Sequence, residues 1–172
     1  MSAFLVFGAY GGIGSDVARS LSGEGHRLAL SGRDPARLGA LAEELGALAV
    51  PADATDFDQV EAVVSATVDR FGELDGVASC VGSLLLKPAH LTRAEEWSET
   101  LQTNLTSAFA VLRSAVKPMM KQGHGSIVLV STAAAAIGLP NHEAIAAAKG
   151  GIDALVRSAA ATYGRAGVRV NA

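Results

Sequence analysis

The fold of this chain is decided by one stretch, AFLVFGAYGGIG, at residues 3–14. Its five apolar residues, Ala3–Phe7, predict a buried strand, and the glycines that follow predict a tight turn that opens a helix. A dinucleotide needs such a turn, a backbone free of side chains beside its pyrophosphate, and a helix N-terminus directed at its negative charge. The candidate cofactor-binding residues of this stretch are Gly8, Gly12, Ile13 and Gly14.

Strand-like and helix-like segments alternate along the rest of the chain. Apolar runs predict strands at Ala3–Phe7, Arg27–Ser31, Ala47–Val50, Gly76–Cys80 and Ser126–Ser131. Helical spacing predicts helices at Gly12–Ser22, Pro35–Leu45, Asp56–Phe71, Glu95–Met120 and His142–Tyr163. Such alternation is typical of right-handed βαβ crossovers. The sequence therefore predicts an α/β fold, a doubly wound parallel sheet with helices on both faces.

The last residues of the sequence, Val168–Ala172, have the pattern of the beginning of a sixth strand. A sheet that stopped there would expose a fresh edge and the flanks of the preceding helices. We therefore expect one domain over residues 1–172 that is truncated at its sixth strand.

The composition excludes several classes of function. Of the 172 residues, 49% are hydrophobic, so the chain can bury a core rather than remain disordered. A formal charge of −3 without any Lys/Arg block argues against nucleic acid as a partner. No apolar run approaches the roughly 20 residues that cross a bilayer, and the start lacks the basic leader of a signal peptide. Cys80 is the only cysteine, which favours a cytoplasmic location and a packing role for this thiol.

The end of the second predicted strand indicates which nicotinamide cofactor is preferred. An acid that binds the ribose 2′-hydroxyl, and so selects NAD, is expected about 20 residues after the glycine-rich turn. Gly32 stands at that place, and Arg33 follows with a guanidinium suited to the 2′-phosphate of NADP. NAD remains the alternative, because a solvated surface arginine would explain Arg33 equally well. Asp34, followed by Pro35, is better explained as a helix N-cap.

Polar residues elsewhere offer one more cofactor contact and no metal site. Asp53 follows the third predicted strand, where it could accept a hydrogen bond from the adenine amino group; the alternative is a turn residue. No histidines or acids have metal-ligand spacing, and His26, His90 and His124 lie in turn-like contexts. The sequence therefore predicts no metal site.

Further motifs follow the glycine-rich turn in a fixed order, namely Asp53-Ala54-Thr55, Asn104-Leu105-Thr106, Ser131-Thr132 and Ala148-Lys149-Gly150. In order and spacing they resemble the short-chain dehydrogenase/reductase family over essentially the whole chain. The resemblance implies a Rossmann-like sheet, a nicotinamide cofactor, and hydride transfer to or from a small carbonyl, alcohol or conjugated enoyl substrate. It also implies a homodimer or homotetramer, whose contact helices would be residues 99–120 and 142–163.

The chain departs from the family pattern at its catalytic residues. The family's Tyr-x-x-x-Lys has Ile145 in place of the tyrosine, whereas the lysine is retained as Lys149. By resemblance Lys149 would hold the nicotinamide ribose and take part in catalysis together with Asn104. The family's catalytic serine falls on Thr132, with Ser131 one residue earlier. Of the family's Asn-Asn-Ala-Gly only Gly82 remains, which would approach the cofactor.

His142 is a candidate replacement for the missing proton donor. Enoyl-reductase relatives place their tyrosine seven residues before the lysine, which is the position of His142. Positions four and seven before Lys149 flank one stripe of a helix, and histidine titrates near neutrality. The alternative is that His142 only occupies the first turn of its helix, hydrogen-bonded to the backbone.

Two functions therefore follow from the sequence. The first is an oxidoreductase that prefers NADP and acts on a carbonyl, alcohol or enoyl substrate. The second is a catalytically impaired dinucleotide-binding protein that serves as a sensor or scaffold. Ile145 favours the second, because isoleucine cannot donate a proton, whereas the retained Asn104, Thr132 and Lys149 favour the enzyme.

Overall fold

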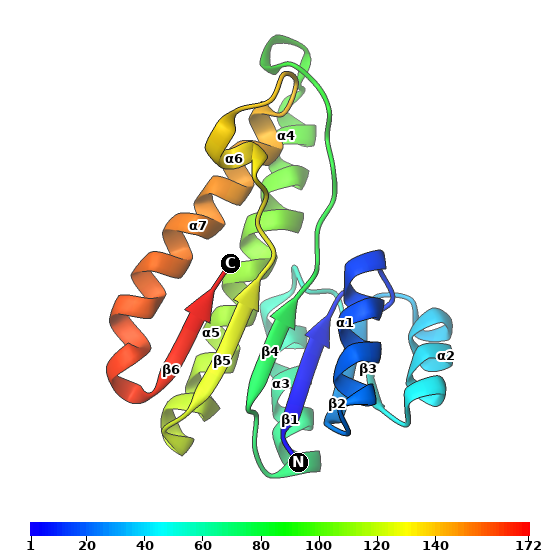
Figure 1. Ribbon diagram of the computed structural model, residues 1–172. Helices are drawn as coiled ribbons and strands as arrows, with labels where there is room; N and C mark the ends of the chain where they lie inside the picture. Colours follow the sequence, from blue (N-terminus) through cyan, green and yellow to red (C-terminus); the bar gives the residue numbers. More distant parts are fainter.

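The alternating segments form one parallel sheet of six strands with the order β3-β2-β1-β4-β5-β6 (Figure 1). The computed structural model describes all 172 residues. Its strands are β1 (Ala3–Phe7), β2 (Arg27–Gly32), β3 (Leu48–Pro51), β4 (Gly76–Ser79), β5 (Gly125–Leu129) and β6 (Val168–Asn171). Every neighbouring pair is parallel. The predicted doubly wound sheet is confirmed, and its end residues pair with β5 as a sixth strand.

The α-helices are α1 (Gly12–Gly23), α2 (Pro35–Leu45), α3 (Phe57–Phe71), α4 (Ala94–Leu101), α5 (Ser107–Gln122), α6 (Ala134–Ile137) and α7 (Glu143–Tyr163). Short 3₁₀ turns lie at Ala89–Leu91 and Gly164–Ala166. These turns and α6 were not predicted, because segments of three or four residues show no hydrophobic period. The predicted N-cap Asp34 is confirmed, since its carboxylate accepts hydrogen bonds from two amides at the start of α2.

The predicted helix Glu95–Met120 is one continuous helical stretch, but it is not regular. A π-helical turn, Gln102–Thr106, joins α4 to α5. Such a turn inserts one extra residue per ring and often marks a functional position. It changes the direction in which the buried Asn104 points relative to a regular helix.

Two apolar clusters hold the helices on opposite faces of the sheet. One cluster joins α1 and α2 to the first two strands through residues such as Val6, Ala18, Leu30 and Leu38. The larger cluster joins α3, α5 and α7 to the other face, with Ile152 of α7 among its members. Beyond the carboxyl ends of the strands, α4, α6 and the chain between β4 and α4 rise above the sheet (Figure 1).

The sheet is covered unevenly. In β5, Ile127 and Leu129 point into the larger cluster and are completely buried, whereas Val128 points to the other face and is 43% exposed. In β1, by contrast, both alternating sets, represented by Leu5 and Val6, are completely buried. The half of the sheet that carries β1 and β2 is thus covered on both faces, and the half with β5 and β6 mainly on one.

Candidate functional site

A cleft of about 170 Å³ opens at the carboxyl ends of the first four strands. It lies where the strand order reverses, since β1 has β2 on one side and β4 on the other. Ligands of open parallel sheets bind at such a switch point. The cleft is lined by 15 residues, which include the predicted cofactor-binding residues Gly8, Arg33, Asp53 and Gly82.

The glycine-rich turn is required by backbone packing. Gly8 has φ +69°, and a Cβ there would lie 2.9 Å from the carbonyl carbon and oxygen of Cys80. A Cβ on Gly14 would overlap the carbonyl oxygen of Gly8. A Cβ on Gly12 would meet nothing within 4 Å, so open space faces this glycine. The turn therefore presents bare backbone to the cleft.

The start of α1 carries hydrogen-bond donors without acceptors. The amides of Gly12, Ile13 and Gly14 make no backbone hydrogen bond, and no side chain caps the helix. Gly11 donates to the carbonyl oxygen of Gly8, which closes the turn. Free amides at a helix N-terminus carry partial positive charge and attract an anion. This end of the cleft can therefore hold a pyrophosphate.

The residues after β2 and β3 differ in how much of their hydrogen bonding is satisfied. Arg33 lines the cleft, is exposed, and forms no ion pair or hydrogen bond. Asp53 also lines the cleft, but its Oδ1 accepts hydrogen bonds from the amide and the hydroxyl of Thr55. The turn interpretation of Asp53 is thus visible in the structure, while its Oδ2 has no protein partner.

Asn104, Gly82 and Lys149 meet above the ends of β4 and β5. Asn104 is completely buried, and its side chain accepts from the amide of Ser83 and donates to the Ser83 hydroxyl and the Thr100 carbonyl. A Cβ on Gly82 would lie 2.9 Å from Asn104 Oδ1 and 3.5 Å from Lys149 Nζ. The π-helical turn thus ties α4 and α5 to the chain after β4.

Lys149 lies in a desolvated position. Its Nζ donates a 2.7 Å hydrogen bond to the carbonyl oxygen of Val130, and burial lowers the pKa of this amine. Cys80 is near enough to interact electrostatically with Lys149, but burial has the larger effect and raises the pKa of the thiol. A protonated, partly buried thiol fits the predicted packing role of Cys80.

Ser131 and Thr132 do not end strand five as the sequence suggested. β5 already ends at Leu129, because the chain turns away from the sheet toward α6. Ser131 Oγ donates to the backbone carbonyl of Lys149 at 3.2 Å. Thr132 Oγ1 accepts from the amide of Ala134 at 3.3 Å, so its hydroxyl caps the next turn.

His142 is the N-cap residue of α7, which begins at Glu143, one residue later than predicted. Its Nδ1 donates to the carbonyl oxygen of Pro140 at 2.7 Å, which leaves Nε2 as the free ring nitrogen. No hydrogen bond joins His142 to Lys149, Thr132 or Asn104. Ile145, predicted to stand at the tyrosine position of the resembled family, is buried with only 4% of its surface exposed.

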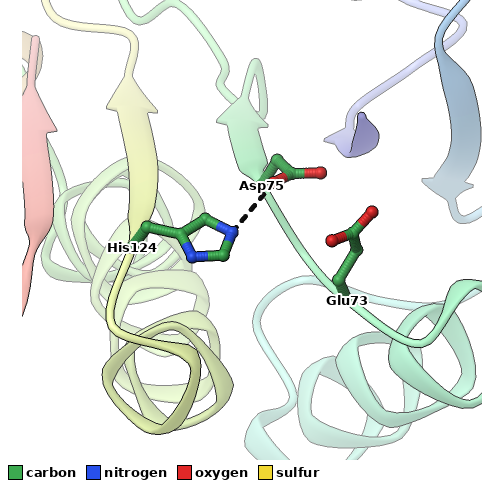
Figure 2. Close-up of side chains that lie close together, drawn as sticks. All are labelled: Glu73, Asp75 and His124. Atoms are coloured by element: carbon green, nitrogen blue, oxygen red, sulfur yellow. Dashed lines mark hydrogen bonds and ion pairs between the residues drawn. The ribbon is translucent and has the colours of Figure 1, made fainter. Parts of the chain in front are cut away.

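A group that the sequence did not reveal lies at the opposite, amino end of the strands. Glu73, Asp75 and His124 each place one ligand atom within 4.8 Å of the others. Figure 2 shows His124 Nε2 facing Asp75 Oδ1, at 3.1 Å, with Glu73 beside them. Asp75 also accepts from the amide of Ala3, and Glu73 pairs with Arg27. These bonds tie strand ends together, and the separation of 49 positions between Asp75 and His124 hides the grouping from any spacing rule.

Comparison with known proteins identifies the family. A family model described as enoyl-(acyl carrier protein) reductase matches residues 8–172. The structure of a short-chain type dehydrogenase/reductase from Mycobacterium ulcerans superposes with a TM-score of 0.96 at 31% identity, covering 99% of this chain and 65% of that one. This chain belongs to the short-chain dehydrogenase/reductase family.

Named members of this family are similar over nearly all of the chain. Levodione reductase of Leifsonia aquatica is 34% identical over 98% of this chain and 66% of its own length. The 3-oxoacyl-(acyl-carrier-protein) reductase of Staphylococcus aureus is 32% identical over 98% of this chain and 71% of its own length. A substituted actinorhodin polyketide ketoreductase, solved with NADPH, superposes with a TM-score of 0.94 at 28% identity, covering 99% of this chain and 68% of that one.

The chain spans about two thirds of the length of these family members. The family members named here are reductases or dehydrogenases, so the sensor or scaffold alternative receives no support from them. No helix of the structure has both the length and the apolar character needed to cross a bilayer.

Proposed function

We propose that this protein is an oxidoreductase that prefers NADPH and exchanges hydride with a small carbonyl or alcohol, or reduces a conjugated enoyl group. The observation that carries the proposal is the bare glycine-rich turn beneath three free amides of α1. That arrangement fits a pyrophosphate by shape and charge. When bound, the nicotinamide cofactor would supply hydride to a carbonyl or enoyl group in its reduced form, or accept hydride from an alcohol in its oxidised form.

Each cofactor residue has a task that follows from its chemistry. The amides of residues 12–14 bind the pyrophosphate, and Gly82 lets the backbone approach the nicotinamide side. Arg33 binds the 2′-phosphate, because its guanidinium lines the cleft and has no protein partner. Asp53 accepts from the adenine amino group through Oδ2. Lys149 binds the nicotinamide ribose with the donors that its bond to Val130 leaves free.

The proton for the substrate oxygen has two candidate sources, His142 and a bound water molecule. Ile145 cannot supply it, and His142 is hydrogen-bonded to Pro140 without contact to the other catalytic candidates. Asn104 and Lys149 converge at Gly82, which favours water held between them as the carrier. Thr132 would orient the substrate oxygen by donating its hydroxyl hydrogen, because Oγ1 only accepts from the amide of Ala134, at 3.3 Å.

The substrate class is supported by the names of the relatives. Levodione reductase and the 3-oxoacyl-(acyl-carrier-protein) reductase reduce carbonyl groups by name, and D-threitol dehydrogenase of Mycolicibacterium smegmatis, 33% identical, oxidises an alcohol by name. The description of the family model keeps an enoyl substrate as the second option. We therefore place carbonyl compounds first in any substrate panel.

Binding and turnover test the proposal separately. NADPH and NADH are titrated into the protein by nucleotide fluorescence, and NADPH consumption is then followed with ketones and enoyl thioesters. We expect tighter binding of NADPH than of NADH, and hydride transfer to at least one substrate. Equal affinities would contradict the cofactor preference, and tight binding without any turnover would contradict the enzyme assignment.

We also propose that the protein forms a homo-oligomer and acts in the cytoplasm. Phe109 of α5 is 45% exposed beside a hollow between α5 and α7 that Leu105, Gly151 and Leu155 line. Exposed apolar surface between two helices favours contact with a second copy. Phe109→Glu should shift the species seen by light scattering toward monomer, and an unchanged mass would contradict this contact.

A further inference from the structure

The ring of Tyr10 occupies the space beside Gly32. A Cβ built on Gly32 would lie 3.0 Å from Cδ1 and 3.1 Å from Cζ of Tyr10, and closer still to Cε1. Gly32 has no left-handed backbone, so the ring alone opposes a side chain there. Both residues line the cleft. An acid that would bind the ribose of NAD belongs at this strand end.

Tyr10 is held in place at two points. Its hydroxyl accepts a 2.9 Å hydrogen bond from the amide of Asp34. The guanidinium of Arg37 lies 4.6 Å from the centre of its ring, and the same side chain donates to the Tyr10 carbonyl oxygen at 3.2 Å. Asp34 Oδ1 accepts from the amides of Ala36 and Arg37, so this carboxylate is fixed as the N-cap of α2. Moving the ring therefore breaks a hydrogen bond and a cation–π contact.

We infer that Tyr10 is a specificity-determining residue, which excludes an acid from position 32 because its ring, held by Asp34 and Arg37, fills the space beside Gly32. This inference rests on the proposed binding of a dinucleotide in the cleft. The filled space disfavours the hydrogen bond that NAD would need, and the charge of Arg33, which lines the same cleft, favours the 2′-phosphate of NADP. Introducing an acid is then insufficient to change the preference unless the ring is removed as well.

A double-mutant cycle tests the inference. The parent, Gly32→Asp, Tyr10→Ala and the double variant are titrated with NADPH and NADH, and their melting temperatures are recorded. Tyr10→Phe, alone and with Gly32→Asp, keeps the ring but removes the bond to Asp34. Gly39→Asp is the matched charge control, because a Cβ on Gly39 of α2 meets nothing within 4 Å.

We expect Gly32→Asp alone to lower the melting temperature and to weaken NADPH binding by about tenfold or more, without strengthening NADH binding. In the Tyr10→Ala background the same substitution should increase the NADH affinity by about tenfold. In the Tyr10→Phe background the change in NADH affinity should lie between those in the parent and Tyr10→Ala backgrounds. Gly39→Asp should leave the preference unchanged.

Different outcomes contradict the proposed function and the inference about Tyr10. If the parent binds neither dinucleotide, the proposed function falls and the inference falls with it. If the parent binds NADPH but Gly32→Asp improves NADH equally with and without the Tyr10 ring, the inference alone is overturned.

Discussion

The turn between β1 and α1 and the start of α7 form the two ends of one functional region, and they follow the family pattern to different degrees. At the turn, Gly8 and Gly14 are required by contacts between backbone atoms. At α7, Ile145, which the sequence predicts to stand at the family's tyrosine position, is buried, and the His142 ring hydrogen-bonds only to the Pro140 carbonyl among protein groups. A site made of backbone tolerates almost no substitution, whereas a site made of side chains can change residue by residue while the fold persists. Cofactor binding and proton donation can therefore separate.

The largest effect should come from Lys149, to which the proposal gives both a cofactor contact and a place in the proton route. Lys149→Ala should lower NADPH-dependent turnover by roughly 10²–10⁴-fold, because it removes both the ribose contact and the ordering of water near Asn104. His142→Phe should change turnover by less than about threefold, since its ring forms no hydrogen bond with the other catalytic candidates. Initial rates with one ketone compare the two variants with the parent. A silent Lys149→Ala beside an inactive His142→Phe would reverse the assignment of the proton route.

The backbone end should respond through stability. Gly14→Ala places a methyl group against the carbonyl of Gly8, so the free energy of unfolding should fall by about 2–4 kcal/mol, with loss of dinucleotide binding. Gly39→Ala is the matched control within a helix and in open space, and it should stabilise by about 0.5–1 kcal/mol. Urea denaturation measures both. Equal effects of the two substitutions would show that the turn is not constrained as described.

Arg33→Ala should sharpen the comparison at the cofactor end. Removing the unpaired guanidinium should reduce the difference in binding free energy between NADPH and NADH by about 1.5–3 kcal/mol, because a charge-assisted bond to the 2′-phosphate is lost. The NADH affinity should stay nearly constant, which separates this effect from general damage. Fluorescence titration gives both affinities, and an unchanged difference would place the 2′-phosphate elsewhere.

At position 145 we expect a gain in activity that is smaller than the losses expected at Lys149, Gly14 and Arg33. Ile145→Tyr returns a hydroxyl four residues before Lys149, and ketone reduction should rise by about tenfold. The gain is limited because Ile145 is buried, and the larger ring costs about 1–3 kcal/mol of stability. Turnover at constant NADPH saturation is the measurement. If the parent transfers no hydride and this variant does, the natural protein binds the dinucleotide without turning it over.

Much of the architecture could be predicted from local patterns. Apolar runs and helical spacing located all five predicted strands and helices within a few residues, and Asp34 before Pro35 marked the start of α2 correctly. The predicted end of β5 is two residues too late, because the β-branched, apolar Val130 continues the run of Ile127–Leu129 after the chain has left the sheet. The π-helical turn was missed for a related reason, since one extra residue barely disturbs a helical period.

The sequence by itself determined the glycine-rich turn and the alternation that produces a parallel sheet, because each is a local property of the residues. Only the tertiary structure decided which side chains meet. It brought Asn104 and Lys149 to Gly82, placed the Tyr10 ring beside Gly32, and joined Asp75 to His124 at the other end of the strands. These contacts cross many residues of chain, and they depend on strand order, crossover direction and the π-helical turn, which no spacing rule contains.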